Sequence, residues 1–455
     1  MNSEITSSGL VGEIANYIWK RTDTNPSFAE TCAAALVATA IGPNVVVPTR
    51  MGDNRLNVFG ICVGGTGISN KTVALDIVRL MARGLGKKLE RRVLLPSKFS
   101  IEGLANYLAT ETNWGLIVGD EFTTMITQRS KTWLSDIMEF LSKLWDGYIP
   151  QYVTIQRGVE GVPFVYVNFL SATTFYLAKL LKREGDDFFI QGTGCRFLWD
   201  LDFRRELMDE DPSQAIEWFL DPFSREELMA ELDGYIEELA LLHSKIEEIS
   251  EISQYKDGIF ILRPTMEAAV ELYKYRVETI NRAICLFNKD LTNPDSGYIA
   301  RLAQNAIKLA GVHYLGRVYQ DLSLSNNEEL PQIELEDVRW AIKKMEHHFR
   351  MYVKLKEISE EATSKLTSGY QADWQKVLDT IDSKGGKASI SDIMKRTRWK
   401  SKHALEILQS MILAKIIESK RIKPPRSKEH VVYVRYGAKI PEVEKWLVRD
   451  EEASH

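Results

Sequence analysis

The chain has 455 residues, enough for two or three domains, and its 44% hydrophobic and 27% charged residues are typical of an ordinary globular protein. No stretch approaches the roughly 20 apolar residues that cross a bilayer, and the first residues lack the basic and apolar regions of a signal peptide. The composition therefore excludes a membrane-spanning protein and predicts a cytoplasmic one. Four separated cysteines without a C-x-x-C pair favour reduced thiols over a disulfide framework or a zinc site: Cys32, Cys62, Cys195 and Cys285.

The net charge of −5 is divided unevenly along the chain. Residues 371–440 hold 16 Lys and Arg against 7 Asp and Glu, a net charge of +9, which leaves −14 for all other residues. A basic C-terminal module attached to an acidic body predicts a nucleic-acid surface at that end.

The first 45 residues are predicted to form an N-terminal helical segment. Residues 9–41 have the pattern of two helices, and the second is announced by the turn and cap sequence Asn25-Pro26-Ser27. A short strand is expected over residues 44–48, where the chain enters its next domain.

The stretch around which we interpret the chain is a glycine-rich loop in residues 57–72. An apolar, strand-like run turns through three glycines and leads into a helical pattern from Lys71 to Met81, which is expected to end near residues 84–86. Backbone N–H groups of such a loop point at nucleotide phosphates, and the helix adds its N-terminal dipole. We therefore predict that ATP is bound by Gly64, Gly65, Thr66, Gly67, Ile68, Ser69, Asn70, Lys71 and Thr72.

The match to the phosphate-loop pattern G-x-x-x-x-G-K-[ST] has one departure. Gly65, Lys71 and Thr72 fit, but Asn70 occupies the second glycine position. Asn tolerates left-handed backbone angles better than most residues, so the loop geometry is expected to survive. The alternative is a plain glycine-rich turn of an α/β domain.

A second nucleotide motif lies in residues 114–121, where an apolar strand ends in Asp120 and Glu121. One carboxylate at this place can hold Mg²⁺ and the other can orient and deprotonate the attacking water. We predict that Thr72 and Asp120 hold Mg²⁺ and that Glu121 is the catalytic base. The alternative is an acidic pair that only starts a helix.

Residues 46–210 are predicted to form the α/β core, built on a mostly parallel sheet. Ser100 is expected to cap a helix, and a helix is expected over residues 132–145. Two β-rich runs, 151–156 and 163–172, are expected to form a hairpin around residues 157–161. A last strand over residues 196–201 is expected to close the sheet.

Residues 211–363 are predicted to be an α-helical lid, followed by a linker at Ser364–Gly369. Residues 370–440 have the pattern of three helices and a β-wing, a winged helix-turn-helix, and residues 441–455 form a C-terminal tail. Protein binding is the alternative role for such a module, but its charge favours DNA. The predicted DNA contacts at the third helix and on the wing are Lys400, Lys402, Arg421, Lys423, Arg426 and Lys428.

The order of several motifs resembles a known family. These motifs are residues 57–72, residues 99–104, the strand into Asp120-Glu121, and Gly194-Cys195-Arg196-Phe197. Over roughly residues 25–350 the chain resembles the primase-helicase-like P-loop ATPases of plasmids, phages and archaea, which have AAA+ character. Archaeal members often have a polar residue before the lysine, as Asn70 is here. The resemblance implies an AAA+-like P-loop NTPase core.

The resemblance also implies roles for residues outside the two motifs. Thr173, with Thr174 and Ser171 as near alternatives, is similar to the sensor that monitors the γ-phosphate. Arg196 is similar to an arginine finger that reaches a neighbouring subunit's nucleotide, and Arg301 is a weaker sensor candidate. The alternatives are a strand cap for Arg196 and a solvated helix position for Arg301.

An arginine finger acting between subunits requires a ring or filament. The resemblance implies a homo-oligomer, usually a hexamer, with Arg157 at a hairpin tip that contacts DNA in the central pore. A solvated turn is the alternative for Arg157. The family also implies a primase or another replication protein as a partner.

Two functions are consistent with these predictions. The leading one is an ATP-hydrolysing DNA motor or remodeller of replication, most concretely a hexameric helicase-like ATPase. The alternative is a nucleotide-switched loader or regulator that binds DNA or a partner through its winged helix without unwinding. The two differ in whether DNA raises the rate of ATP hydrolysis and whether binding is sequence-selective.

Overall fold

The chain divides into two compact units, Met1–Lys356 and Glu357–His455. Among the helices that the structure describes, none has an apolar stretch long enough to cross a bilayer. The computed structural model describes residues 5–50, 52–127, 137–149, 152–153, 158–159, 162, 164–178, 192–203, 225–252, 258–291, 293–322, 330–413, 416–425, 428–438 and 440–447.

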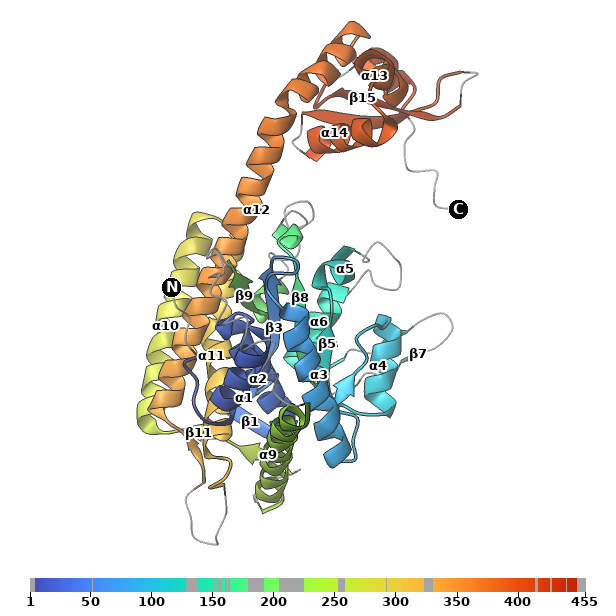
Figure 1. The fold of residues 1–455 in the computed structure, drawn as a ribbon. Helices are drawn as coiled ribbons and strands as arrows, with labels where there is room; N and C mark the ends of the chain where they lie inside the picture. The colour runs from blue at the N-terminus through green and yellow to red at the C-terminus, as the bar shows by residue number, and fades with distance from the viewer. Residues whose placement is uncertain are drawn as a thin grey trace, which may run out of the picture. The chain divides into compact units, whose positions relative to one another are not determined.

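A five-stranded, all-parallel sheet forms the centre of the first unit (Figure 1). Across the sheet the strands are β4 (Leu94–Leu95), β5 (Trp114–Gly119), β8 (Tyr166–Thr173), β3 (Phe59–Gly64) and β9 (Leu198–Asp202). Strands β3, β5, β8 and β9 are buried along their whole length. Continuous apolar runs of this kind are expected where helices cover both faces of a parallel sheet. The structure confirms the predicted α/β core with a mostly parallel sheet.

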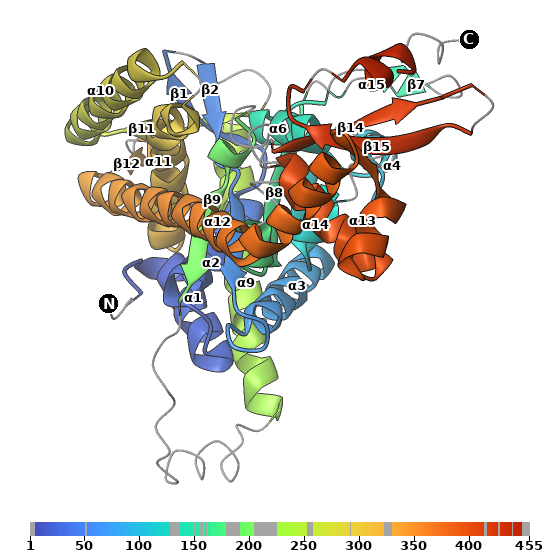
Figure 2. The ribbon, with the colours of Figure 1, turned by 90° about the horizontal axis from the view of Figure 1, so that it is seen from above.

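Aromatic side chains fill the interior beside the central strands. Phe59, Phe122, Phe169 and Phe197 are buried, and their ring centroids lie 5.5–6.2 Å apart in tilted or edge-on pairs. Edge-on pairs of this kind add to the stabilisation from apolar burial. Figure 2 shows β8 and β9 running among the helices of this unit.

Two helices beside the sheet begin at the caps that the sequence predicts. Asn25 caps α2 by accepting a hydrogen bond from Ser27 N at 2.8 Å, and Ser100 caps α4 by accepting one from Gly103 N at 3.0 Å. Helices α2 and α3 pack against the sheet and each other, and α6 packs against β8. These helices are α1 (Gly9–Thr22), α2 (Pro26–Ile41), α3 (Lys71–Lys88), α4 (Ile101–Thr110), α5 (Phe122–Thr127) and α6 (Ile137–Asp146).

Four long helices follow the sheet, as predicted for the region after residue 210. Helix α9 packs against α2 and α3, and α10 packs against α11. The helices are α9 (Arg225–Ile252), α10 (Met266–Lys289), α11 (Pro294–Val318) and α12 (Leu335–Ser383). Short strands form two small sheets beside them: β1 (Val45–Thr49), β2 (Gly52–Arg55), β10 (Phe260–Ile261), β11 (Arg263–Pro264) and β12 (Gln332–Ile333).

The predicted hairpin has a different second arm. Strand β6 (Tyr152–Val153) pairs with β7 (Gly158–Val159), and Ile149 forms an antiparallel bridge with Val162. The run 163–172, which was expected to be the second arm, instead leads into β8 (Tyr166–Thr173) in the middle of the parallel sheet. The continuous burial of β8 explains the difference, because a hairpin arm with one solvated face would alternate apolar and polar residues.

One predicted break in a helix was wrong, because helix α12 continues through Ser364–Gly369. Helix α3 ends at Lys88, two residues beyond the predicted end near residues 84–86. A single glycine in a helix costs only about 1 kcal/mol, and neither stretch contains proline. Gly84 marks a close helix contact, since a Cβ there would clash with the side chain of Ile236 on α9.

The second unit contains the end of α12 and a three-stranded antiparallel sheet with the order β13-β15-β14. Its apolar core includes Trp374, Val377, Ile393, Ile407 and Met411. The sequence did not predict strand β13 or helix α15, and the expected tail from residue 441 begins as α15, whose Val443 packs against β14 and β15. The remaining elements are β13 (Lys387–Ser389), α13 (Ile390–Thr397), α14 (Ser401–Leu413), β14 (Ile417–Ile422), β15 (His430–Arg435) and α15 (Pro441–Lys445).

Candidate nucleotide-binding site

The glycine-rich loop joins the end of β3 at Gly64 to the start of α3 at Lys71. Gly67 has φ 72° and Asn70 has φ 45°, both in the left-handed region. The prediction that Asn70 adopts left-handed angles in the second glycine position is therefore confirmed. A hydrogen bond from a residue outside the loop holds it in place, because Thr24 Oγ1 donates to Ser69 O at 3.1 Å. Thr24 lies between α1 and α2, and no pattern in the sequence connects it with the loop.

Lys71 lies inside the loop that it follows. Its Nζ donates to the carbonyl oxygens of Gly64 at 2.9 Å and Gly65 at 3.0 Å. Burial lowers the pKa of Lys71, while the nearby Cys62, Asp202 and Glu121 favour its charged form. The ammonium group thus has two carbonyl partners that an anionic ligand can replace.

A cavity of about 260 Å³ opens at the carboxyl edge of the sheet, beside the loop. Its lining residues are Gly65, Thr66, Gly67, Asn70, Lys71, Thr72, Val73, Asp120, Glu121, Ala172, Thr173 and Thr174. Most of the predicted nucleotide and metal residues are therefore brought together. Among the predicted loop residues, Gly64, Ile68 and Ser69 do not line the cavity. Val73, Ala172 and Thr174 were not assigned to it, although Thr174 had been named as an alternative sensor.

The acidic pair follows β5, and the sheet register sets its surroundings. Strands β5 and β8 are parallel neighbours in which Gly119 pairs with Ser171, so Glu121 reaches the level of Thr173. Thr173 Oγ1 donates to Glu121 Oε1 at 2.5 Å, and Thr123 N donates to the same oxygen at 3.3 Å. The carboxylate of Glu121 is thereby oriented by two donors.

Thr123 is a second residue that sequence reasoning missed. Its hydroxyl forms a short hydrogen bond with the hydroxyl of Thr173. Ser171, the other alternative sensor, donates to Gly119 O at 3.2 Å and does not line the cavity. Of the three candidates, only Thr173 has a hydrogen bond to the glutamate among the described residues.

Asp120 pairs with Arg79 of α3. Arg79 also contacts Asp76 and donates to Val118 O at 3.3 Å, while the Asp120 side chain remains 61% exposed. The Thr72 hydroxyl and the two carboxylates supply the oxygen ligands that Mg²⁺ prefers, and all three residues line the cavity. The residues present therefore fit a magnesium ion, although Arg79 competes for Asp120.

Arg196 lies at the opposite edge of the sheet. It ends the short 3-10 helix η3 (Gly194–Arg196) ahead of β9, whose first residue pairs with Gly60 on β3. It is only 8% exposed and donates to Asp146 Oδ2 at 3.0 Å and to Gly192 O at 2.8 Å. An arginine finger must leave its own subunit to reach a neighbour's nucleotide. The burial and pairing of Arg196 do not suit that role.

Arg301 belongs to the same amino-edge cluster as Arg196. Its guanidinium lies 5.8 Å from the ring centroid of Trp145, and burial lowers its pKa. Lys308 is also buried there, with Nζ 3.6 Å from the same centroid and 2.7 Å from Asn57 Oδ1. The sheet therefore separates Arg196 and Arg301 from the cavity beside the glycine-rich loop.

Seven DNA-binding residues were predicted, and the five that the structure describes lie on the second unit. Lys400 and Lys402 flank the start of α14, Arg421 and Lys423 lie at the end of β14, and Lys428 precedes β15. All five are exposed, and no described residue forms an ion pair with any of them. By contrast, Lys420 pairs with Glu444 at 3.0 Å, and Arg435 pairs with Asp382. The other two, Arg157 and Arg426, lie outside the described residues.

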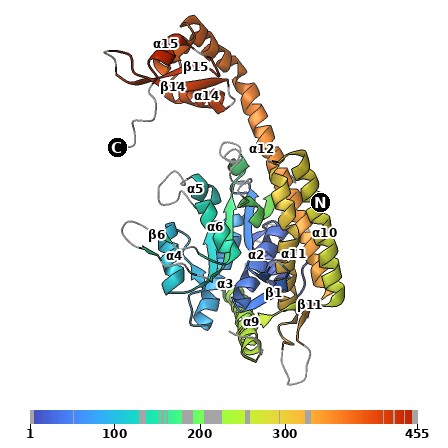
Figure 3. The same ribbon diagram turned by 180° about the vertical axis from the view of Figure 1, so that it is seen from behind.

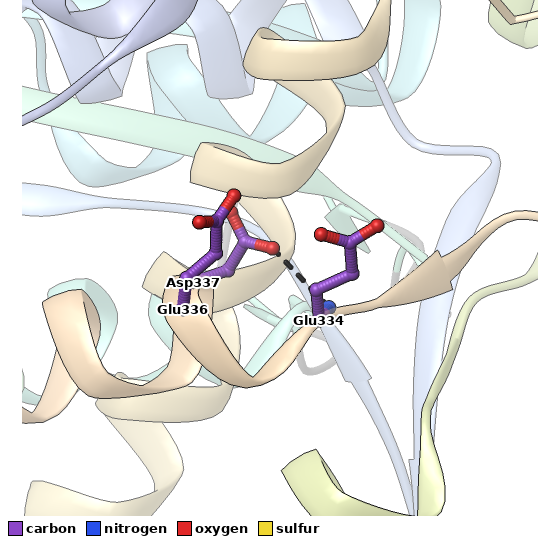
Figure 4. A group of neighbouring side chains, drawn as sticks. All are labelled: Glu334, Glu336 and Asp337. Atoms are coloured by element: carbon purple, nitrogen blue, oxygen red, sulfur yellow. Dashed lines mark hydrogen bonds between the residues drawn. The ribbon is translucent and has the colours of Figure 1, made fainter.

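An acidic cluster in the first unit has a geometry that superficially suits a metal (Figure 4). Its members are Glu334, Glu336 and Asp337. Arg317 contacts all three at 2.8–3.1 Å, and His313 Nδ1 lies 2.7 Å from Asp337. Burial opposes ionisation of Asp337, but these hydrogen bonds outweigh it and lower its pKa. Arg317 therefore supplies the positive charge that a metal would bring.

The sequence matched no model of a known protein family and no curated protein.

Proposed function

We propose that the protein is a P-loop ATPase of AAA+ type whose C-terminal winged helix binds DNA. The observation that carries the proposal is the convergence of the glycine-rich loop, the acidic pair and Thr173 on one cavity. Open parallel sheets bind ligands at the carboxyl ends of their strands, which is where this cavity lies. A plain glycine-rich turn would not require a lysine, two carboxylates and a threonine from three strands to meet there.

Each of these residues of the cavity would have a separate role in phosphoryl transfer. Lys71 would exchange its carbonyl partners for the β- and γ-phosphates, and the loop N–H groups would bind the phosphate oxygens. Thr72 and Asp120 would hold Mg²⁺, which when bound neutralises phosphate charge. Glu121 would accept the proton of the attacking water while Thr173 holds the carboxylate in position.

The DNA-binding part of the proposal is supported by the charge on the second unit. In the winged-helix arrangement the third helix enters a major groove and the wing contacts phosphates. Here α14 is that helix, with Lys400 and Lys402 at its start, and β14 and β15 form the wing with Arg421, Lys423 and Lys428. These exposed cations have no described acidic partner, so a polyanion can bind them without breaking ion pairs.

The first test measures ATP binding and hydrolysis in two variants. Lys71→Ala should lose ATP binding, whereas Glu121→Gln should keep ATP binding and lower kcat at least about 100-fold, because only the proton acceptor is removed. Glu102→Gln, which changes an exposed glutamate in the first turn of α4, is the control. Hydrolysis that persists in Glu121→Gln would reject the assigned base.

The second test separates the DNA part from the nucleotide part. Replacing Lys400, Lys402 and Arg421 by alanine should weaken DNA binding and reduce its salt dependence, since each phosphate contact contributes to the salt slope. Lys420→Ala, which removes a cation already paired with Glu444, should have a small effect. DNA binding that is unchanged in the triple variant would argue for a protein partner on this surface.

One observation favours the second candidate function, a nucleotide-switched loader or regulator. Without an arginine in the neighbouring site, hydrolysis by a P-loop protein is slow, and the buried Arg196 is poorly placed to act there. For this reason the proposal includes no hexameric ring. A rate of ATP hydrolysis that rises strongly with DNA supports a motor or remodeller. A slow rate that is indifferent to DNA, with sequence-selective binding, supports the switch.

A further inference from the structure

Helix α10 has two apolar faces, and among the described residues of the first unit only one of them is packed against other elements. The inner face packs against α11 and consists of Ala268, Leu272, Tyr275, Thr279 and Ala283. The Tyr275 hydroxyl donates to Glu346 of α12 at 2.9 Å, and Arg282 pairs with the same carboxylate at 3.1 Å. The helix is therefore firmly attached along this face, beside α11 and α12 (Figure 3).

The other face carries an exposed apolar stripe, here named the α10 seam. Along the helix the spacing of its residues alternates between four and three. Met266 is 81% exposed, Tyr273 68%, and the remaining members are 40–49% exposed except for the half-buried Ile280. The seam consists of Met266, Val270, Tyr273, Val277, Ile280, Ile284 and Phe287. Contiguous exposed apolar residues of this kind mark interaction surfaces.

An alternating spacing of four and three is the heptad pattern of a coiled coil. Val270, Val277 and Ile284 occupy the first core position of successive heptads, and all three are β-branched. Leu291, which lies just beyond the helix and is 72% exposed, continues the same spacing. A helix that needed only its inner contacts would carry polar residues along this stripe.

We propose that the α10 seam is the interface between two copies of this chain, packed antiparallel about a twofold axis. An interface of this symmetry uses the same patch on both copies. In an antiparallel pair Val270 of one copy faces Phe287 of the other, Val277 faces Ile280, and Ile284 faces Tyr273. Each layer then combines a β-branched residue with a residue of at least equal size. A parallel pair would instead place Tyr273 against Tyr273 and Phe287 against Phe287.

The polar residues that flank the seam are compatible with the antiparallel arrangement. On one side Glu267 lies beside Asn288 of the other copy, and Lys274 lies beside Asn281. On the other side Arg276 faces Ala283, and Asp290 faces Ala269. No like charges meet along either flank, so the pairing carries no electrostatic penalty.

The dimensions of the seam set the expected strength of the dimer. A helix of 24 residues is about 36 Å long and, with its side chains, about 10 Å wide. Such a contact lies at the small end of specific interfaces, so we expect reversible association rather than an obligate dimer. Dimerisation through the α10 seam does not require a nucleotide. We therefore measure it in a Lys71→Ala background, which excludes nucleotide-driven assembly.

Sedimentation velocity over a range of concentrations tests the interface. The full chain should form dimers, and Tyr273→Glu or Val277→Glu should weaken dimerisation at least about tenfold, because each carboxylate would be buried against an isoleucine of the other copy. Both side chains are exposed, so the variants should fold, which circular dichroism checks. Lys289→Glu, outside the seam on the same helix, should leave dimerisation unchanged. A chain that stays monomeric to about 100 µM, or forms oligomers insensitive to these changes, would overturn the proposal.

Cross-linking tests the orientation in a Cys285→Ser background, which removes the exposed cysteine. Position 274 does not face its own counterpart, because the antiparallel register pairs it with position 281 of the other copy. A mixture of Lys274→Cys and Asn281→Cys chains should therefore cross-link with a short bismaleimide at least about tenfold faster than either variant alone. Cross-linking of each variant with itself, and none across the mixture, would reject the antiparallel pair.

Discussion

The two edges of the central sheet hold similar side chains in different settings. At the carboxyl edge, Lys71 contacts two carbonyl oxygens and lines a cavity of about 260 Å³. At the amino edge, Lys308 contacts Asn57 Oδ1 and the ring of Trp145, which fills the space that a ligand would need. Burial lowers the pKa of both lysines. A buried lysine with a perturbed pKa is thus insufficient to identify a site, and an adjoining cavity distinguishes the two.

The carboxylates differ between the edges in the same way. Glu121 is exposed and takes its hydrogen bonds from Thr173 and from Thr123 N, so its second oxygen can face a ligand. Asp146 binds the guanidinium of the buried Arg196 through both oxygens, at 3.0 and 3.3 Å. We infer that the carboxyl edge is built for exchange of partners and the amino edge for stability.

The largest effect that would test this comparison is expected from Arg196→Ala. Arg196→Ala removes a guanidinium whose residue is only 8% exposed, so the Gly192 carbonyl and the partly exposed Asp146 lose their donor, and the free energy of unfolding should fall by about 2 kcal/mol. Urea denaturation measures this change. Arg92→Ala, which breaks an exposed pair with Glu111, should leave the free energy of unfolding nearly unchanged. Normal stability combined with lost ATP hydrolysis in Arg196→Ala would restore the arginine-finger interpretation.

A smaller effect is expected from Thr173→Val at the carboxyl edge. The change keeps the shape of the side chain but removes the donor to Glu121, so kcat for ATP should fall about tenfold with little change in ATP affinity. Steady-state kinetics and equilibrium ATP binding measure the two quantities. Thr174→Val is the matched control, since Thr174 also lines the cavity. A larger loss in Thr174→Val would move the sensor role to that residue.

The smallest effect concerns the competition between Arg79 and the metal for Asp120. Arg79→Ala should lower the Mg²⁺ concentration for half-maximal ATPase activity about threefold, because an ion pair with an exposed partner contributes less than about 1 kcal/mol. Titration of Mg²⁺ at fixed ATP measures the shift. Arg83→Ala, an exposed arginine further along α3, is the control. An unchanged Mg²⁺ requirement would remove Asp120 from the metal site.

Local patterns in the sequence predicted the parts of the site that depend on local backbone geometry. The glycine-rich loop and the left-handed angles of Asn70 follow from residue types within a few positions of one another. The acidic pair was found because it ends an apolar strand. Parallel pairing of β5 with β8 then brings Glu121 to Thr173, a contact that could be anticipated only through a family resemblance.

Features that depend on distant pairing were predicted poorly. Arg79 and Asp120 are far apart in sequence and meet only because α3 packs against β5. Whether Arg196 lies at the carboxyl or the amino edge of the sheet depends on the direction of β9. The order of the strands along the sequence does not give that direction. The predictions of a hairpin arm at residues 163–172 and of a linker at Ser364–Gly369 were wrong because turn residues were given more weight than burial and helix propensity.

The left-handed Asn70 has a consequence for the entropy of the loop. Glycine would populate many backbone conformations there, whereas asparagine has fewer, so less conformational freedom remains to be lost when a ligand closes the loop. The hydrogen bond from Thr24 to the adjacent Ser69 carbonyl restricts the loop further. The glycine-rich loop is therefore largely preorganised, with its rigidity built into the chain before any ligand binds.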